Sequence, residues 1–147
     1  MEHQADVIIV GTGVAGLFCA LQLPKELHIL MITKDKAEHS DSYLAQGGIS
    51  TLRTPEDYDS YFEDTMRAGH YKNNPDSVDV MIRSSPQIIQ NLIDFGVEFE
   101  RTSDGLSYTR EGAHSTFRIL HHKDITGYEI TSKLMAQVQQ RPYIHIE

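Results

Sequence analysis

A glycine-rich turn near the start of the chain constrains its fold more than any other feature. The turn, Gly11-Thr-Gly-Val-Ala-Gly16, follows the β-branched run Asp6–Val10 and opens an apolar, helix-like segment at residues 14–23. A second apolar run, Leu27–Thr33, comes next. The order strand, glycine turn, helix, strand is typical of a βαβ unit. We therefore predict an α/β domain with a parallel sheet whose first strand is buried on both faces.

The three glycines of this turn have distinct physical roles in a dinucleotide site. Gly11 permits a tight turn, Gly13 lets the backbone approach a pyrophosphate, and Gly16 lets the helix pack closely on the strand. The helix N-terminus then offers free N–H groups and a partial positive charge to the phosphates. The alternative is a glycine turn that binds nothing. An NAD site usually has an acidic residue about 20 positions later, whereas Lys34 stands at the end of the second run and argues against an ordinary NAD site.

Two helical regions are predicted in the middle of the chain, after a long polar loop at residues 34–52. Apolar side chains at helical spacing predict an amphipathic helix that begins near Tyr58 and ends near Gly69. A second helical region, residues 77–95, contains Ser84-Ser85-Pro86. Because proline removes a backbone donor and serine favours helix N-termini, we predict a break there and a new helix after it.

The last third of the chain is predicted to contain a hairpin, a helix and a strand. The hairpin spans residues 97–110 around an Asp104-Gly105 turn. The segment Thr126-Gly-Tyr-Glu129 has the spacing of a capping box and opens the helix. The alternating run Tyr143–Glu147 predicts a strand on the last residues. This position, with 39% hydrophobic residues, leads us to expect a fragment of a larger domain.

Composition narrows the class of protein. The chain has 13 basic and 21 acidic residues, a formal charge of −8, so we expect no nucleic-acid partner. The single cysteine, Cys19, cannot form an internal disulfide. No run approaches the roughly 18 apolar residues of a membrane span, and no apolar signal segment precedes the first strand. We therefore expect a cytoplasmic protein with no membrane partner.

Further motifs accompany the glycine turn and make the pattern specific. Thr33-Lys34 ends the second apolar run, and Asp41–Ile49 contains Ala-Gln-Gly-Gly-Ile. Thr109-Arg-Glu-Gly-Ala-His-Ser115 follows later in the chain, with Arg118-Ile-Leu-His121 and Asp124-Ile-Thr-Gly127 after it. In this order and spacing, the sequence resembles the succinate dehydrogenase and fumarate reductase flavoprotein family over essentially its whole length. The resemblance implies a Rossmann-like FAD-binding domain, of which residues 1–147 would form the N-terminal portion.

The resemblance also implies which residues contact FAD. They are Gly11, Thr12, Gly13, Val14, Ala15, Gly16, Lys34, Asp41, Ser42, Tyr43, Leu44, Ala45, Gln46, Gly47 and Gly48. Glycines in the last stretch can let the backbone lie against a flat flavin, and Gln46 can both donate and accept hydrogen bonds at the ring edge. Respiratory members of the family attach FAD to a histidine five positions before the glutamine. Asp41 stands there in this chain, so we expect FAD to be held non-covalently.

Glu111 is the candidate substrate-binding residue. The chain is most similar to the amino-acid-oxidising branch of the family, in which a glutamate of this motif orients the substrate by contacting its ammonium group. The implied reaction is the oxidation of L-aspartate to iminoaspartate, with oxygen or fumarate as the electron acceptor. The product would pass to quinolinate synthase in NAD biosynthesis. The capping and C-terminal helical domains of the family are absent from these residues, so we expect the chain alone to be inactive.

Several alternatives remain open on the sequence alone. Glu111 could be an exposed glutamate paired with Arg110. The chain could belong to a soluble fumarate reductase or succinate dehydrogenase flavoprotein, to a non-catalytic flavin-binding fragment or, less in keeping with Lys34, to an NAD-dependent dehydrogenase. No metal site is expected, because neither cysteines nor paired carboxylates accompany the histidines at ligand spacing. Phe95 and Phe99 are expected in the core rather than against a cofactor.

Overall fold

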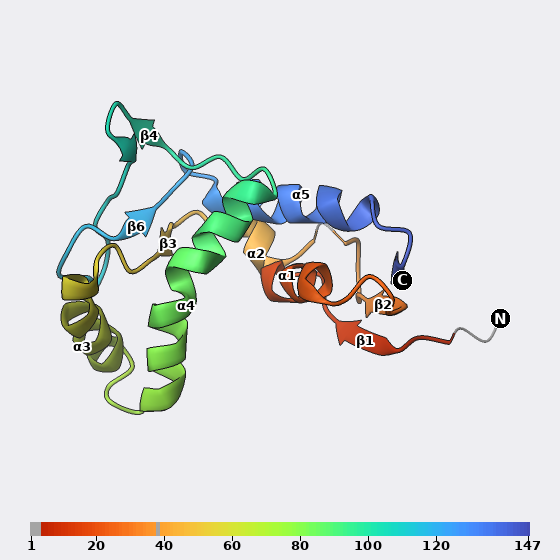
Figure 1. Ribbon diagram of the computed structural model, residues 1–147, viewed down its shortest axis with the longest axis horizontal. Helices are drawn as coiled ribbons and strands as arrows, with labels where there is room; N and C mark the ends of the chain where they lie inside the picture. Colours follow the sequence, from red (N-terminus) through yellow and green to blue (C-terminus); the bar gives the residue numbers. More distant parts are fainter. Residues whose placement is uncertain (1–3, 38) are drawn as a thin grey trace. The chain divides into compact units, whose positions relative to one another are not determined.

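The computed structural model describes residues 4–37 and 39–147 (Figure 1). These residues divide into two compact units. The first contains residues up to 46 together with 95–97 and 125–147, and the second contains residues 47–94 and 98–124. None of the helices within the described ranges is long and apolar enough to cross a membrane.

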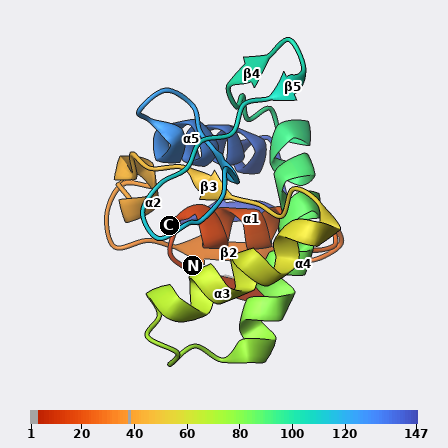
Figure 2. The same cartoon turned by 90° about the vertical axis from the view of Figure 1, so that its left-hand side faces the viewer.

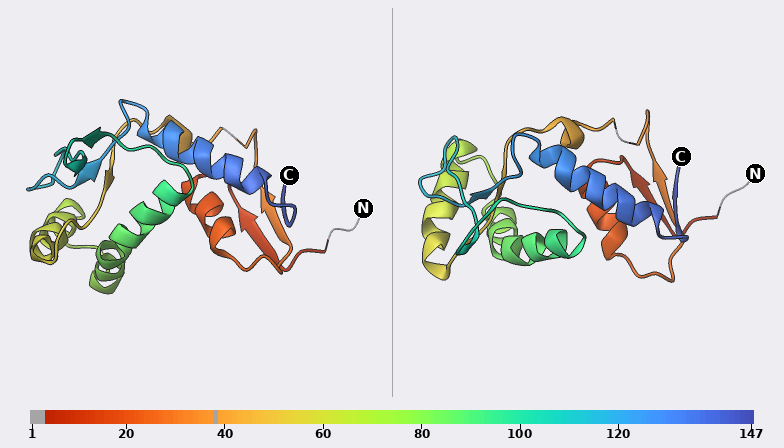
Figure 3. Two further views of the ribbon diagram at one scale, coloured as in Figure 1. Left: turned by 45° about the horizontal axis from the view of Figure 1, so that its top comes forward. Right: turned by 90° about the horizontal axis from the view of Figure 1, so that it is seen from above.

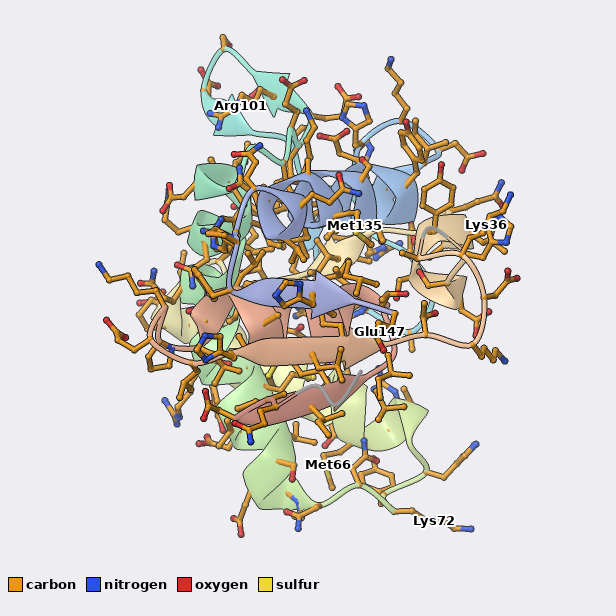
Figure 4. All side chains as sticks on the ribbon, turned by 90° about the vertical axis from the view of Figure 1, so that its right-hand side faces the viewer. Lys36, Met66, Lys72, Arg101, Met135 and Glu147 are labelled. Carbon is orange, nitrogen blue, oxygen red and sulfur yellow. The ribbon has the colours of Figure 1, made fainter. Side chains whose placement is uncertain are left out.

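The first unit is built on a three-stranded parallel sheet. Its strands are β1 (Val7–Val10), β2 (Ile29–Ile32) and β7 (Ile144–Ile146), in the order β1-β2-β7. Figure 4 shows the three strands side by side, with Glu147 at the end of β7. The register places Ile9 beside Met31 and Met31 beside Ile146. The parallel sheet predicted from the sequence is therefore confirmed.

Three helices complete the first unit: α1 (Val14–Gln22), α2 (Asp41–Leu44) and α5 (Thr126–Gln139). Helices α1 and α5 pack against each other along the sheet (Figure 3). Their buried core comprises Leu17, Ala20, Ile29, Met31, Ile130, Leu134 and Val138. Phe95 packs edge-on against Phe18, with ring centroids 6.3 Å apart.

The prediction that the first strand is buried on both faces is wrong for this chain. Ile8 is 59% exposed and Val10 is 85% exposed, whereas Val7 and Ile9 are partly buried. Successive side chains of a strand point to opposite faces of the sheet. Because α1 and α5 contact each other, they pack on the same face of the sheet. The apolar run fits a parallel sheet, but it does not show how many of its faces this chain covers.

The second unit combines two helices with two short antiparallel pairs. Its elements are β3 (Ile49–Ser50), a 3₁₀ turn (Pro55–Asp57), α3 (Tyr58–Ala68), α4 (Pro75–Asp94), β4 (Arg101–Thr102), β5 (Gly105–Leu106) and β6 (Ile119–Leu120). Helices α3 and α4 lie side by side, and β4 and β5 form a small hairpin (Figure 2). The core of this helix pair is Tyr61, Met66, Val78 and Ile82. Phe99, predicted to be core, is 5% exposed.

The predicted helix break at Pro86 is also wrong, because α4 runs through it. A proline inside a helix leaves the carbonyl four residues earlier without its backbone donor. That carbonyl belongs to Ile82, and the hydroxyl of Ser85 donates to it at 2.7 Å. Ser85 therefore replaces the lost bond instead of capping a new helix.

Two other segments differ from their predictions. The polar loop at residues 34–52 is not entirely irregular, since it contains α2 and β3. Ser40 caps α2 by accepting a hydrogen bond from the backbone N–H of Tyr43. The capping box predicted at Thr126 is not formed in that register, because Thr126 is already helical and the N-cap position is Ile125. An isoleucine side chain has no acceptor to offer the helix N-terminus.

Candidate functional site: a glycine loop and a glutamate turn

The glycine loop has the geometry that a dinucleotide site requires. Gly11 has a φ of +106°, which glycine adopts without strain, and its N–H donates to the carbonyl of Ile32 at 2.8 Å. A Cβ on Gly16 would lie 2.2 Å from the carbonyl oxygen of Gly11. Only glycine at position 16 therefore lets the start of α1 lie this close to the turn that follows β1.

The N-terminus of α1 offers an anion-binding surface. The N-cap residue is Gly13, which has no side chain to cap the helix. The N–H of Val14 donates instead to the hydroxyl of Ser42, 3.1 Å away, in α2. Because the first N–H groups of a helix have no intrahelical partner, they attract phosphate groups. The structure thus brings Ser42 to the helix N-terminus.

Replacing Gly16 by alanine is expected to destabilise the first unit. Alanine in a helix is favoured over glycine by about 1 kcal/mol, but the new Cβ would overlap the Gly11 carbonyl oxygen. Overlap of this kind costs about 1–3 kcal/mol, so we expect a net loss in the free energy of unfolding, measured with urea. The matched control is Gly47→Ala, where the nearest atom to a Cβ is 3.6 Å away. A Gly16→Ala chain as stable as the original would contradict the packing role.

Lys34 is exposed and follows β2. A polar contact close to it in the sequence holds the next loop. Thr12 is 3% exposed, and its hydroxyl donates a hydrogen bond to the carbonyl of Ala37 at 3.0 Å. His39 contacts the carboxylate of Asp35 at 3.1 Å. The role of Thr12 was not anticipated, because its partner is 25 residues away in the sequence.

A further glycine, Gly127, lets α2 pack closely against α5. The N–H of Gly127 donates to the carbonyl of Ala45 at 2.9 Å. A Cβ at this position would lie 2.1 Å from the carbonyl oxygen of Ser42. Gly127 is part of the Asp-Ile-Thr-Gly motif, but the need for glycine there could not be inferred from the sequence. Glycine is required at this position because the backbone lies close to the helix that carries Ser42.

Gly47 and Gly48 belong to the second unit and differ in their surroundings. A Cβ on Gly48 would lie 2.2 Å from a methyl group of Ile119 and 2.5 Å from the carbonyl oxygen of Leu120. The packing of β3 on β6 therefore requires glycine at 48, whether or not a flavin lies nearby. A Cβ on Gly47 would meet only one atom within 4 Å, the carboxylate oxygen Oε2 of Glu111 at 3.6 Å. The structure thus brings Glu111 to the Ala-Gln-Gly-Gly-Ile loop.

Glu111 lies on a turn at the tip of a loop. Backbone hydrogen bonds between Thr109 and Ile119 close the loop, and the N–H of His114 donates to the carbonyl of Glu111. Glu111 is exposed. Across residues 4–37 and 39–147, none of the ion pairs includes it, and the guanidinium of Arg110 lies over the ring of Phe117 instead. Its carboxylate is therefore open to a cation from outside the turn.

The base of this loop is held by a buried arginine that begins the Arg-Ile-Leu-His motif, but to which the sequence analysis assigned no role. Arg118 is fully buried and pairs with two carboxylates, Asp57 and Asp64, each at 2.7 Å. Burial opposes ionisation of Asp64, but hydrogen bonds from Ser115 and Arg118 outweigh it and hold the pKa of that carboxyl well below its ordinary value. The sequence feature that could have indicated this cluster is the helical spacing of polar residues on the inner face of α3.

No metal site was found among the described residues. No three of their histidine, cysteine, aspartate and glutamate side chains are grouped to hold an ion. His114 contacts Arg118 rather than a carboxylate, and the ring of His122 contacts the carbonyl of Glu98.

Comparison with known proteins adds three observations. The family model described as "FAD binding domain" matches residues 6–147. An L-aspartate oxidase of Clostridium perfringens is 47% identical over 146 residues, which cover 99% of this chain and 33% of that protein. An L-aspartate oxidase of Clostridium acetobutylicum is 48% identical over 147 residues, 99% of this chain and 34% of that protein. The chain thus spans about a third of the length of the curated relatives it matches.

Solved structures show the same fold. A quinol fumarate reductase of E. coli matches with a TM-score of 0.91 at 29% identity, covering 99% of this chain and 26% of that one. The Sdh1 complex of Mycobacterium smegmatis matches with a TM-score of 0.84 at 27% identity, covering 98% of this chain and 27% of that one. The resemblance stated from the sequence motifs is confirmed. The chain belongs to the FAD-binding domain family, among flavoproteins that include the L-aspartate oxidases and fumarate reductases, and FAD is its cofactor.

Proposed function

We propose that this chain carries the flavin-binding residues and one substrate-binding residue of an enzyme that oxidises L-aspartate to iminoaspartate. The observation that supports this most is the position of Glu111, whose carboxylate lies against Gly47 of the Ala-Gln-Gly-Gly-Ile loop. The similarity to L-aspartate oxidases at 47–48% identity supports the same substrate. The product would enter quinolinate formation on the route to NAD.

The first unit fits the cofactor. Gly13 has no side chain to cap α1, so the first turn after Val14, whose own N–H donates to Ser42, can offer backbone N–H groups to a pyrophosphate. Lys34 is exposed at the end of β2, where the resemblance implies a FAD contact. We propose that FAD contacts residues 11–16, Lys34 and residues 41–48.

Glu111 would hold the substrate through its ammonium group. FAD, when bound, supplies the two-electron acceptor that takes a hydride from the substrate Cα, and oxygen or fumarate then reoxidises it. As the C–H bond breaks, a C=N bond would form and the nitrogen would release a proton to solvent. The carboxylate of Glu111 has no cationic partner in its own loop, so an ammonium group would meet a full negative charge. Exclusion of water would strengthen that attraction.

A chimera tests this proposal. In the chimera, residues 1–147 of this chain replace the matching residues of the Clostridium acetobutylicum enzyme. We expect peroxide to form with L-aspartate and oxygen, and not with succinate. The unsubstituted Clostridium acetobutylicum enzyme is the positive control. An FAD-loaded chimera that forms no peroxide with L-aspartate would overturn the proposal.

A soluble fumarate reductase is the second candidate function, favoured by the TM-score of 0.91 to a quinol fumarate reductase. It predicts that the chimera oxidises succinate or reduces fumarate far better than it oxidises L-aspartate. A non-catalytic flavin-binding role predicts bound FAD with no turnover of either substrate. The same assay therefore separates all three.

Acid precipitation is expected to release the flavin from the FAD-loaded chimera into the supernatant. Asp41 occupies the position at which the respiratory members of the family carry the attachment histidine, and a carboxylate there cannot reproduce that histidine–flavin bond. The measurement is the visible absorbance of supernatant and pellet, with free FAD added to denatured protein as the control. A pellet that stays yellow after washing would contradict non-covalent binding.

A further inference from the structure

Arg118 joins the Glu111 loop to the beginning of α3. Its guanidinium is fully buried, and its Nη2 donates to Asp57 at 2.7 Å and to Ser60 at 2.6 Å. Its Nε donates to the other oxygen of Asp57 at 3.0 Å. Its Nη1 donates to Asp64 at 2.7 Å. A buried cation needs this number of acceptors, because each unsatisfied donor would otherwise lose its bond to water.

Asp64 is the point at which α3 holds the turn itself. One oxygen, Oδ2, accepts hydrogen bonds from the backbone N–H of Ser115 at 2.6 Å and from its hydroxyl at 2.7 Å, in addition to Arg118. The other, Oδ1, accepts from Arg67 at 2.6 Å, and Arg67 also donates to the carbonyl of Ala113. One buried carboxylate thus fixes two residues of the turn that begins at Glu111.

Apolar packing does little to hold this turn. Ala113 is exposed, and Phe117 is 55% exposed. Gly112 has a φ of +52°, and in the part of the chain that the structure describes no atom beyond its chain neighbours lies within 4 Å of its Cβ position. A pocket of about 240 Å³ is lined by Ala113 and His114 of the turn, with Tyr61 and others from the rest of the unit. The charged hydrogen bonds therefore determine where the turn lies.

The same cluster keeps the turn free of a competing cation. Arginine has no acceptor, so the Nδ1 of His114 must accept from Arg118, at 3.1 Å, and a neutral ring then carries its proton on Nε2. Burial and the charge of Arg118 lower the pKa of His114, against the opposing charges of Asp64, Asp57 and Glu111. A neutral His114 leaves the carboxylate of Glu111 unpaired on its own turn.

We propose that Asp64 is a positioning residue for Glu111. Through Ser115 and Arg118 it fixes the turn so that the Glu111 carboxylate stays beside Gly47, 3.6 Å from its Cβ position. The inference rests on the proposed function for the identity of the substrate. The positioning itself is a property of the chain and has its own readout.

The kinetic test is Asp64→Asn in the chimera. We expect KM for L-aspartate to rise by about tenfold or more while kcat changes by less than about threefold, because the variant loses substrate binding rather than chemistry. The affinity for FAD should stay within about twofold. The matched control is Asp79→Asn, which neutralises an aspartate on α4 that pairs with exposed Arg83. A rise in KM that is accompanied by comparable losses of kcat and of FAD affinity would overturn the proposal and indicate a general structural defect.

Hydrogen exchange supplies the readout that does not depend on activity. In Asp64→Asn the amide of Ser115 should lose protection while the amides of α4 keep theirs. If Asp64→Asn does not accumulate, Ser115→Ala removes one of the same bonds and should raise KM by about threefold. Unchanged protection together with an unchanged KM would overturn the proposal. If the unsubstituted chimera fails to oxidise L-aspartate, the proposed function is wrong, and the exchange result alone decides whether Asp64 positions the turn.

Discussion

Replacing Glu111 by glutamine in the chimera is expected to lower kcat/KM for L-aspartate by about 100-fold, or about 2.7 kcal/mol. The amide keeps the size of the side chain but removes its charge. A hydrogen bond to a charged group contributes about 1.5–3 kcal/mol, and none of the ion pairs among the described residues includes the exposed carboxylate. Fumarate carries no ammonium group, so its reduction should change by less than about threefold. The measurement is steady-state kinetics with both substrates.

The matched control for this variant is Glu26→Gln. Glu26 is an exposed glutamate of the first unit, and its replacement makes the same change in net charge. It should leave both reactions unaltered. Equal losses of aspartate oxidation and fumarate reduction in Glu111→Gln would favour the fumarate reductase alternative.

Replacing Arg118 by methionine is expected to cost about 3–5 kcal/mol in the free energy of unfolding. The variant leaves Asp57 without its guanidinium partner and removes one of the hydrogen bonds to Asp64. Methionine fills part of the volume but cannot donate to either carboxylate. Urea denaturation of the full chain measures the loss. Arg83→Met, which breaks an exposed pair with Asp79, should cost far less than Arg118→Met.

The pH dependence of stability provides a check on the Arg118 cluster. The pKa of Asp64 and that of Asp57 are both lowered from an ordinary 3.8, because hydrogen bonds and the charge of Arg118 outweigh the effect of burial. A lowered pKa contributes stability that is fully present above 3.8 and is lost as the pH falls below that value toward the folded-state pKa. Arg118→Met should therefore lose less stability on acidification than the original chain. Equal acid sensitivity in the two proteins would contradict this role of Arg118.

The parts of the fold that the sequence predicted are those set by local signals. The glycine turn and its two flanking apolar runs predicted β1, α1 and β2, and the packing at Gly16 has the predicted cause. The break at Pro86 was wrong because one hydroxyl, on Ser85, supplies the bond that the proline removes. A prediction from residue propensities does not include the replacement of a backbone hydrogen bond by a side chain.

The parts that the sequence did not predict depend on contacts between distant residues. Asp64 and Arg118 are 54 residues apart, and no motif in the sequence links the two. The packing around Gly48 was not predicted, since the nearest atoms to its Cβ position belong to Ile119 and Leu120 of β6. In each case the residue type could be seen in the sequence, while its partner became apparent only in three dimensions.

Anaerobic mixing of the FAD-loaded chimera with L-aspartate tests the central claim most directly, because it observes electron transfer from substrate to flavin without the reoxidation step. We predict that the visible absorbance of the flavin is lost with L-aspartate, remains with succinate, and returns when oxygen or fumarate is added. A flavin that stays oxidised with L-aspartate but is bleached by dithionite would contradict the assignment of this chain to an aspartate-oxidising enzyme.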